Sequence, residues 1–125
     1  MADILLVDDD VDLVLVYQIA LSQRGHTIRT ACSAAEAQDL LADQPDLLVT
    51  DLMMETKTAG LDLARKAHEM YPEMQILMVS GILEQTGEPM RFADDEPVLP
   101  VVTFVDKPIA PAKLADTVEA MLTPQ

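Results

Sequence analysis

Short, unbroken apolar runs recur along the 125-residue chain, with longer helical stretches between them. The run Ile4-Leu5-Leu6-Val7 shows no alternation of apolar and polar positions, which indicates a strand buried on both faces of a sheet. Helices are expected at about residues 10–24, 33–43, 60–70 and 110–122. Five strands are expected between and around them, at Asp3–Val7, His26–Ala31, Asp46–Thr50, Gln75–Val79 and Val101–Val105. This alternation predicts a doubly wound α/β fold with a parallel sheet.

Local signals support these boundaries, except in one segment. Gly25 follows the first helical stretch, where a left-handed cap favours glycine, and Ser33 opens a capping box before the second. Between residues 81 and 100, Gly87 and Pro89 interrupt the helical residues. A fourth helix in that segment is therefore expected to be short or irregular.

The composition fits a single folded domain that spans residues 1–125. Half of the residues are apolar and 24% are charged, which is enough apolar material for a core. The formal charge of −14, from 22 acidic and 8 basic side chains without any run of Lys or Arg, argues against direct binding to nucleic acid. No apolar run approaches the roughly 18 residues of a membrane span. Together with the single cysteine, Cys32, these features favour the cytoplasm and no membrane contact.

Polar residues stand where the predicted strands end. Three of these positions follow the first strand, and one follows each of the third, fourth and fifth. In chain order they are Asp8, Asp9, Asp10, Asp51, Ser80 and Lys107. Because ligands of an open parallel sheet bind beyond the carboxyl ends of its strands, we expect these side chains to share one site.

These residue types suit magnesium-dependent phosphoryl transfer. Mg²⁺ takes hard oxygen ligands, which Asp8 and Asp9 supply, and without a cation neighbouring carboxylates repel one another. Asp51 is expected to act as a nucleophile toward phosphorus, because a carboxylate needs no base at neutral pH. Lys107 offers a compact positive charge, and Ser80 offers a hydroxyl donor for a phosphoryl oxygen.

Four segments around these residues resemble the signature motifs of bacterial response-regulator receiver domains, the phosphoacceptor domains of two-component and phosphorelay systems. They read Ile4-Leu5-Leu6-Val7-Asp8-Asp9-Asp10, Asp46-Leu47-Leu48-Val49-Thr50-Asp51-Leu52-Met53-Met54, Ile76-Leu77-Met78-Val79-Ser80-Gly81 and Phe104-Val105-Asp106-Lys107-Pro108. The resemblance extends over nearly the whole chain and implies a five-stranded, flavodoxin-like (βα)5 fold. It implies that Asp51 takes a phosphoryl group from a sensor histidine kinase or a histidine phosphotransfer protein, with Mg²⁺ or Mn²⁺ as cofactor. Such a domain catalyses only its own phosphorylation and dephosphorylation.

The resemblance also implies roles for individual residues. Asp9 corresponds to the direct metal ligand, and Asp8 corresponds to its companion, which acts partly through water. Met53 corresponds to the residue whose backbone carbonyl binds the metal, and Lys107 is similar to the lysine that pairs with phosphate. Ser80 corresponds to the switch hydroxyl of the family, and Phe104 corresponds to its switch aromatic residue. In the family these two groups move together and alter a protein-interaction face. The sequence does not identify the downstream protein.

The chain departs from the family pattern after Asp51. Glu55 stands where the family usually has proline, and one residue more than usual precedes Gly60. Two alternatives therefore stay open: a receiver-like binding module that does not use phosphorylation, and a haloacid-dehalogenase-type phosphatase. In such a phosphatase Asp8 and Asp10 would be the nucleophile and the acid, which leaves Asp51 without a role.

The predicted first helix carries apolar residues on all of its sides. The residues expected to face the sheet are Val11, Val14, Leu15 and Leu21, which leaves an apolar outer face of Leu13, Val16, Tyr17 and Ala20. Three interpretations of this face stay open: it docks the phosphodonor, it is covered by the neighbouring helix, or it forms a homodimer contact.

Overall fold

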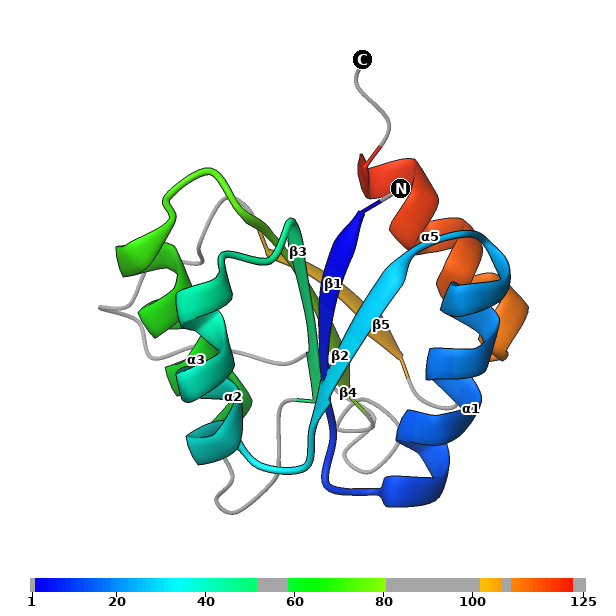
Figure 1. The fold of residues 1–125 in the computed structure, drawn as a ribbon, viewed down its shortest axis with the longest axis horizontal. Coiled ribbons are helices and arrows are strands. Elements are labelled where there is room, and N and C mark those ends of the chain that lie inside the picture. Colours follow the sequence, from blue (N-terminus) through cyan, green and yellow to red (C-terminus); the bar gives the residue numbers. More distant parts are fainter. Residues whose placement is uncertain (1, 52–58, 81–101, 107–108, 123–125) are drawn as a thin grey trace.

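The computed structural model of the chain describes residues 2–51, 59–80, 102–106 and 109–122 (Figure 1). Five parallel strands form one sheet in the order β2-β1-β3-β4-β5. Their bounds, each within one residue of the expectation, are β1 (Asp3–Val7), β2 (Thr27–Ala31), β3 (Leu47–Asp51), β4 (Gln75–Ser80) and β5 (Val102–Asp106). The backbone alone is described for Ser80, Val102, Phe104 and Asp106.

Helices cover both faces of the sheet (Figure 1). One face carries α1 (Val11–Gln23) and α5 (Pro111–Leu122), and the other carries α2 (Ala34–Leu40), its continuation as the 3-10 turn η1 (Leu41–Asp43), and α3 (Ala59–Met70). This strand order with helices on both faces is that of a flavodoxin-like, doubly wound fold, so the predicted fold class is confirmed. The expected short or irregular fourth helix falls in residues 81–101, outside the described residues.

Each central strand divides its side chains between two hydrophobic clusters. Leu5 and Val7 of β1 pack with α2 and α3, whereas Ile4 and Leu6 pack with α1 and α5. Successive side chains of a strand point to opposite faces, so a strand with helices on both sides buries every one of them. This explains why β1 reads as an unbroken apolar run.

Local hydrogen bonds fix the helix ends that the sequence indicated. Gly25 has a φ of 90° just after α1, and the N–H of the following His26 donates to the carbonyl of Leu21 (3.4 Å). This cap needs a left-handed residue, a conformation that glycine adopts readily. At the start of α2, the hydroxyl of Ser33 accepts a hydrogen bond from the N–H of Glu36 (3.1 Å), which confirms the predicted cap.

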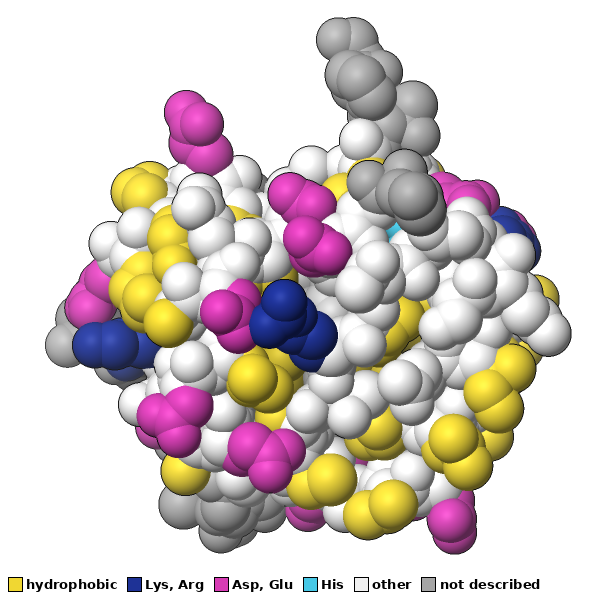
Figure 2. Space-filling model, in the orientation of Figure 1, with side chains coloured by type: hydrophobic (Ala, Val, Ile, Leu, Met, Phe, Trp, Pro, Cys, Tyr) yellow, Lys and Arg dark blue, Asp and Glu magenta, His cyan; other side chains and the backbone are white. Residues whose placement is uncertain are grey.

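The orientation of α1 differs from the prediction. Val14, Tyr17 and Leu21 are buried, with Tyr17 only 2% exposed, whereas Val11 and Leu15 are 64% and 55% exposed. Because apolar residues occur on all sides of α1, their spacing could not select the buried face. Figure 2 shows exposed hydrophobic side chains gathered at the lower right, where α1 lies in Figure 1. Despite this face, none of the helices in the described part of the chain combines the length and hydropathy that crossing a bilayer demands.

Candidate functional site

Two neighbouring strands bring the predicted carboxylates to one edge of the sheet. Val7 of β1 pairs with Thr50 of β3, so Asp8 and Asp51 occupy adjoining positions at the carboxyl ends of these strands. The order of the strands reverses between β1 and β3, which is the point where open α/β sheets bind ligands. Asp51 is the last residue of β3 and not, as expected, the first residue after it, and the same holds for Ser80 in β4. The sheet therefore fixes the backbone of both residues.

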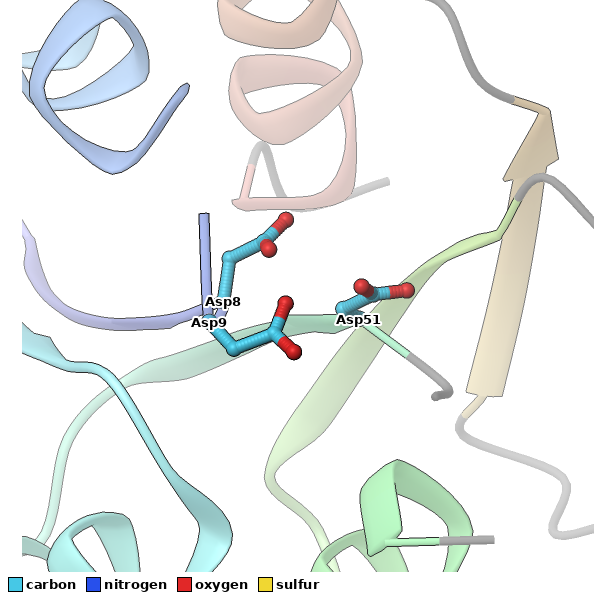
Figure 3. Close-up of side chains that lie close together, drawn as sticks. All are labelled: Asp8, Asp9 and Asp51. Atoms are coloured by element: carbon cyan, nitrogen blue, oxygen red, sulfur yellow. The ribbon is translucent and has the colours of Figure 1, made fainter. Parts of the chain in front are cut away.

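The carboxylates of Asp8, Asp9 and Asp51 form a carboxylate cluster beyond the ends of β1 and β3 (Figure 3). One ligand oxygen from each residue lies within 4.8 Å of the other two. Asp8 and Asp51 are 3% and 8% exposed, whereas Asp9 is exposed. The structure thus brings together three of the residues that the sequence assigned to one site.

The cluster suits a hard divalent cation. Two unit charges about 4 Å apart repel by roughly 4 kcal/mol at the effective dielectric constant found near protein surfaces. Burial of two of the three carboxylates limits how well water can offset this repulsion. Carboxylate oxygens are the ligands that Mg²⁺ and Mn²⁺ prefer, so the donor set fits the predicted cofactor.

Asp10 lies next to the cluster but belongs to the helix. Its carboxylate oxygen Oδ1 accepts a hydrogen bond from the N–H of Leu13 (3.2 Å), which makes Asp10 the N-cap of α1. Its own N–H donates to Oδ1 of Asp8 (2.9 Å). The start of α1 is therefore hydrogen-bonded to a member of the carboxylate cluster.

The register of the sheet places the backbone of two more predicted residues. Ser80 pairs with Asp106 at the carboxyl ends of β4 and β5, next to the strand that ends in Asp51. Phe104 lies two residues before Asp106, within β5. Three predicted features lie outside the described residues: Met53, Lys107 and the altered segment that contains Glu55.

A contact that the sequence did not indicate connects α1 to the chain that follows β5. The hydroxyl of Tyr17 donates a hydrogen bond to the carbonyl of Ile109 (3.0 Å). Ile109 comes two residues after Lys107 in the sequence. The apolar pattern placed Tyr17 on the outer face of the helix, and no spacing rule signals a bond between residues 92 positions apart.

Comparison with known proteins finds related domains. A family model described as the response regulator receiver domain matches residues 4–119. The sensor kinase CckA of Brucella abortus is 31% identical over 127 residues, and the response regulator receiver protein CpdR of the same species is 29% identical over 123 residues. These alignments include 99% and 98% of this chain, and they span 13% of the length of CckA and 98% of the length of CpdR.

Solved structures agree with these sequence matches. The crystal structure of the receiver domain of the hybrid histidine kinase CckA matches with a TM-score of 0.76 at 27% identity, over 97% of this chain and 99% of that one. The receiver domain of NtrX from Brucella abortus matches with a TM-score of 0.76 at 30% identity, over 96% and 98% of the two chains.

Proposed function

The chain belongs to the response-regulator receiver domain family, and on that premise we propose that Asp51 accepts a phosphoryl group from a histidine phosphodonor. The observation that carries this proposal is the carboxylate cluster, in which Asp51 lies at a strand end beside Asp8 and Asp9. The proposal includes one receiver domain over residues 1–125, supported by two hydrophobic clusters that share one sheet.

Asp51 supplies the nucleophile. One carboxylate oxygen forms a bond to phosphorus while the bond from phosphorus to the donor's histidine nitrogen breaks, and the bonding pair stays on that nitrogen. The product is an acyl phosphate on Asp51. Because phosphoryl transfer depends mainly on positioning and charge, the sheet contributes by holding the backbone of Asp51 in β3.

Asp9 and Asp8 are the proposed ligands of Mg²⁺ or Mn²⁺, together with the backbone carbonyl of Met53. The bound cation supplies positive charge that offsets repulsion between the carboxylates and the phosphoryl oxygens. Oδ1 of Asp8 already accepts the N–H of Asp10 (2.9 Å), which supports Asp9 as the direct ligand and Asp8 as the indirect one.

Three residues complete the proposed response to phosphorylation. Lys107 pairs with the phosphoryl oxygens, and the hydroxyl of Ser80 donates to one of them. Phe104 moves with that hydroxyl and alters the protein-interaction face. The position of Ser80 at the end of β4, in the same row of strand ends as Asp51, supports this role.

The exposed face of α1 is the proposed docking surface for the phosphodonor, a sensor histidine kinase or a histidine phosphotransfer protein. Four large apolar side chains support it: Val11, Leu15, Val16 and Ile19. This face adjoins the carboxylate cluster, because α1 begins directly after Asp10. A homodimer contact through the same face is the alternative. The exchange is proposed to occur in the cytoplasm, in keeping with the lone free thiol of Cys32.

The phosphatase alternative is not favoured. It requires Asp10 as an acid next to a nucleophilic Asp8, whereas the carboxylate of Asp10 caps α1. The phosphatase alternative also gives no role to Asp51, which lies in the carboxylate cluster. The proposed domain therefore catalyses its own phosphorylation and dephosphorylation and turns over no separate substrate.

The proposal is tested by incubating the protein with Mg²⁺ and acetyl phosphate and measuring its intact mass. The wild type is expected to gain one phosphoryl group, and Asp51→Asn is expected to gain none. Asp10→Asn is the matched control, because asparagine caps a helix about as well as aspartate, so its uptake should equal that of the wild type.

Three outcomes would contradict the proposal. Equal uptake by Asp51→Asn and the wild type would place the phosphoryl group elsewhere. No uptake by the wild type, together with no binding of a beryllium fluoride mimic, would favour the binding module that does not use phosphorylation. Turnover of a phosphate ester by the wild type, and loss of that turnover in Asp10→Asn, would restore the phosphatase interpretation.

A further inference from the structure

Thr50 places a hydroxyl group among apolar side chains. In β3 it pairs with Val7 of β1 and with Met78 of β4, and all three residues are buried, Thr50 completely. Val7 and Met78 belong to the hydrophobic cluster that packs against α2 and α3. Paired residues of neighbouring strands point to the same face of a sheet, so the Thr50 side chain faces that cluster as well. Such surroundings suit valine, and a threonine there requires a partner for its hydroxyl.

That partner belongs to Asp51, the proposed phosphoacceptor. Oγ1 of Thr50 donates a hydrogen bond to the carbonyl of Asp51 (2.9 Å), and this bond is buried. A buried hydroxyl group costs free energy unless it is hydrogen-bonded, and the bond to Asp51 removes that cost. Because β3 ends at Asp51, the bond holds this carbonyl at the point where the chain leaves the sheet.

The carbonyl and the side chain of Asp51 are both attached to its Cα atom. Only the dihedral angles φ and ψ vary freely along the backbone, and the position of the carbonyl oxygen defines ψ. Because Asp51 is also paired with Val79 in the sheet, a held carbonyl fixes the direction in which its side chain leaves the backbone. Figure 3 shows this side chain at the end of β3, with its carboxylate near those of Asp8 and Asp9.

Both buried carboxylates of the cluster project from strand ends that are held by hydrogen bonds. The N–H of Asp8 donates to the carbonyl of Ala31 (3.2 Å) just beyond β1, and the carbonyl of Asp51 accepts from Thr50 at the end of β3. Reacting atoms must lie about 3–3.5 Å apart and in line for efficient transfer, and small misplacements are costly. A loss of alignment at Asp51 should therefore slow the reaction.

We propose that Thr50 is a positioning residue for phosphorylation: its hydroxyl holds the carbonyl of Asp51 and thereby keeps the Asp51 carboxylate aligned with the incoming phosphorus atom. In this role Thr50 contacts neither the phosphoryl group nor the cation. A valine would fill the same space but would leave the carbonyl of Asp51 without this donor. The inference rests on the proposed function, because it concerns the rate of that reaction.

The test compares Thr50→Val and Thr50→Ser in the full chain. The initial rate of phosphorylation by acetyl phosphate is measured by intact mass at saturating Mg²⁺, at a temperature where circular dichroism shows every variant folded. Thr50→Val is expected to slow the reaction by roughly 2- to 10-fold, the effect of losing one ordinary hydrogen bond that orients the nucleophile. Thr50→Ser keeps the hydroxyl and should stay within about twofold of the wild type, although it leaves a methyl-sized space in the core.

Thr117→Val is the matched control. The hydroxyl of Thr117 donates to the carbonyl of Lys113 at the same distance (2.9 Å), within α5, a helix that contributes no residue to the carboxylate cluster. Both valine substitutions remove a threonine hydroxyl from a backbone carbonyl. Only Thr50→Val should slow phosphorylation.

Three results would each overturn the inference while leaving the proposed function in place. They are an unchanged rate in Thr50→Val, a rate in Thr50→Ser as low as in Thr50→Val, and equal slowing by Thr117→Val. The second result would show that the shape of the side chain matters and its hydrogen bond does not. A wild type that takes up no phosphoryl group would instead overturn the proposed function.

Discussion

Asp8 serves both the fold and the proposed metal site. Its Oδ1 accepts the N–H of Asp10 at the start of α1, and its carboxylate belongs to the carboxylate cluster. Asparagine at this position keeps an oxygen that accepts the hydrogen bond but removes a negative charge, whereas alanine removes both. The two substitutions therefore separate the structural role of Asp8 from its proposed role in metal binding.

Asp8→Asn is expected to weaken Mg²⁺ binding about tenfold or more, a loss of roughly 1.4 kcal/mol, because a charged ligand is lost. In EDTA its melting temperature should rise, since repulsion within the cluster falls. Asp8→Ala should lower the free energy of unfolding by roughly 1 to 2 kcal/mol, because the N–H of Asp10 loses its acceptor. The chain has no tryptophan, so calorimetry and circular dichroism are the suitable measurements. Unchanged Mg²⁺ affinity in Asp8→Asn would contradict this assignment.

Residue types and positions predicted the members of the carboxylate cluster but not the hydrogen bonds around it. Parallel strands share an edge for their carboxyl ends, so Asp8, Asp9 and Asp51 could be grouped without coordinates. Whether a carboxylate faces the site or caps a helix depends on its side-chain rotamer, and this is why Asp10 could be assigned only from the structure. Tyr17 escaped prediction for a similar reason, because its partner is separated from it by most of the chain.

At the scale of secondary structure elements, Arg24 joins the end of α1 to α5. Its guanidinium pairs with Asp116 (2.9 Å) and with Glu119 (2.7 Å). Hydrogen bonds to Asp116 and then to Glu119 raise the pKa of Arg24 above its ordinary value, so the group stays charged throughout the accessible pH range. This pair of contacts holds together the two helices that cover one face of the sheet.

Arg24→Gln is expected to lower the melting temperature, because it removes two ion pairs between α1 and α5. The loss should be larger in about 10 mM NaCl than in about 500 mM NaCl, where ions screen exposed charges. Arg29→Gln is the control. Among the ion pairs of the described residues, Arg29 takes part in one only, with the half-exposed Asp43, so its substitution should change the melting temperature little. Equal losses in the two variants, or a loss independent of salt, would count against the bridging role of Arg24.

Elements with one unambiguous pattern were predicted closely, whereas for α1 the bounds were predicted to within one residue but the buried face was wrong. Strands buried on both faces read as unbroken apolar runs, which fixed β1 and its neighbours to within one residue. In α1 both the buried and the exposed positions are apolar, so periodicity identified a helix without identifying its inner face. The exposed face that misled the prediction is the surface now proposed to dock the phosphodonor.

At the scale of the whole molecule, the net charge of −14 opposes compaction. Cations can relieve this repulsion in two ways, by screening the surface in general and by binding at the carboxylate cluster. Screening depends on ionic strength, whereas binding depends on the identity of the ion and on the ligands. Melting curves at matched ionic strength can therefore distinguish the two contributions.

MgCl₂ is expected to raise the melting temperature more than NaCl at equal ionic strength. A ligand at 100 times its dissociation constant adds about 2.7 kcal/mol to the free energy of unfolding. The rise in melting temperature that is specific to Mg²⁺ should largely vanish in Asp9→Asn, whereas the rise caused by NaCl should remain. Differential scanning calorimetry of both proteins provides the comparison, and an equal Mg²⁺-specific gain in the variant would remove Asp9 from the proposed site.

β1 is the first strand of the sheet to leave the ribosome, yet in the finished sheet it is hydrogen-bonded along both edges. Ile4 pairs with Ile28 on one side and with Leu47 on the other. At about 5–20 residues per second, the second edge stays open for roughly 2 to 9 seconds after β1 has been made. During that interval the unpaired edge of β1, an apolar strand, presents free backbone N–H and C=O groups to other chains, which is the condition that favours aggregation. The second edge of β1 therefore stays open to other chains until Leu47 has emerged.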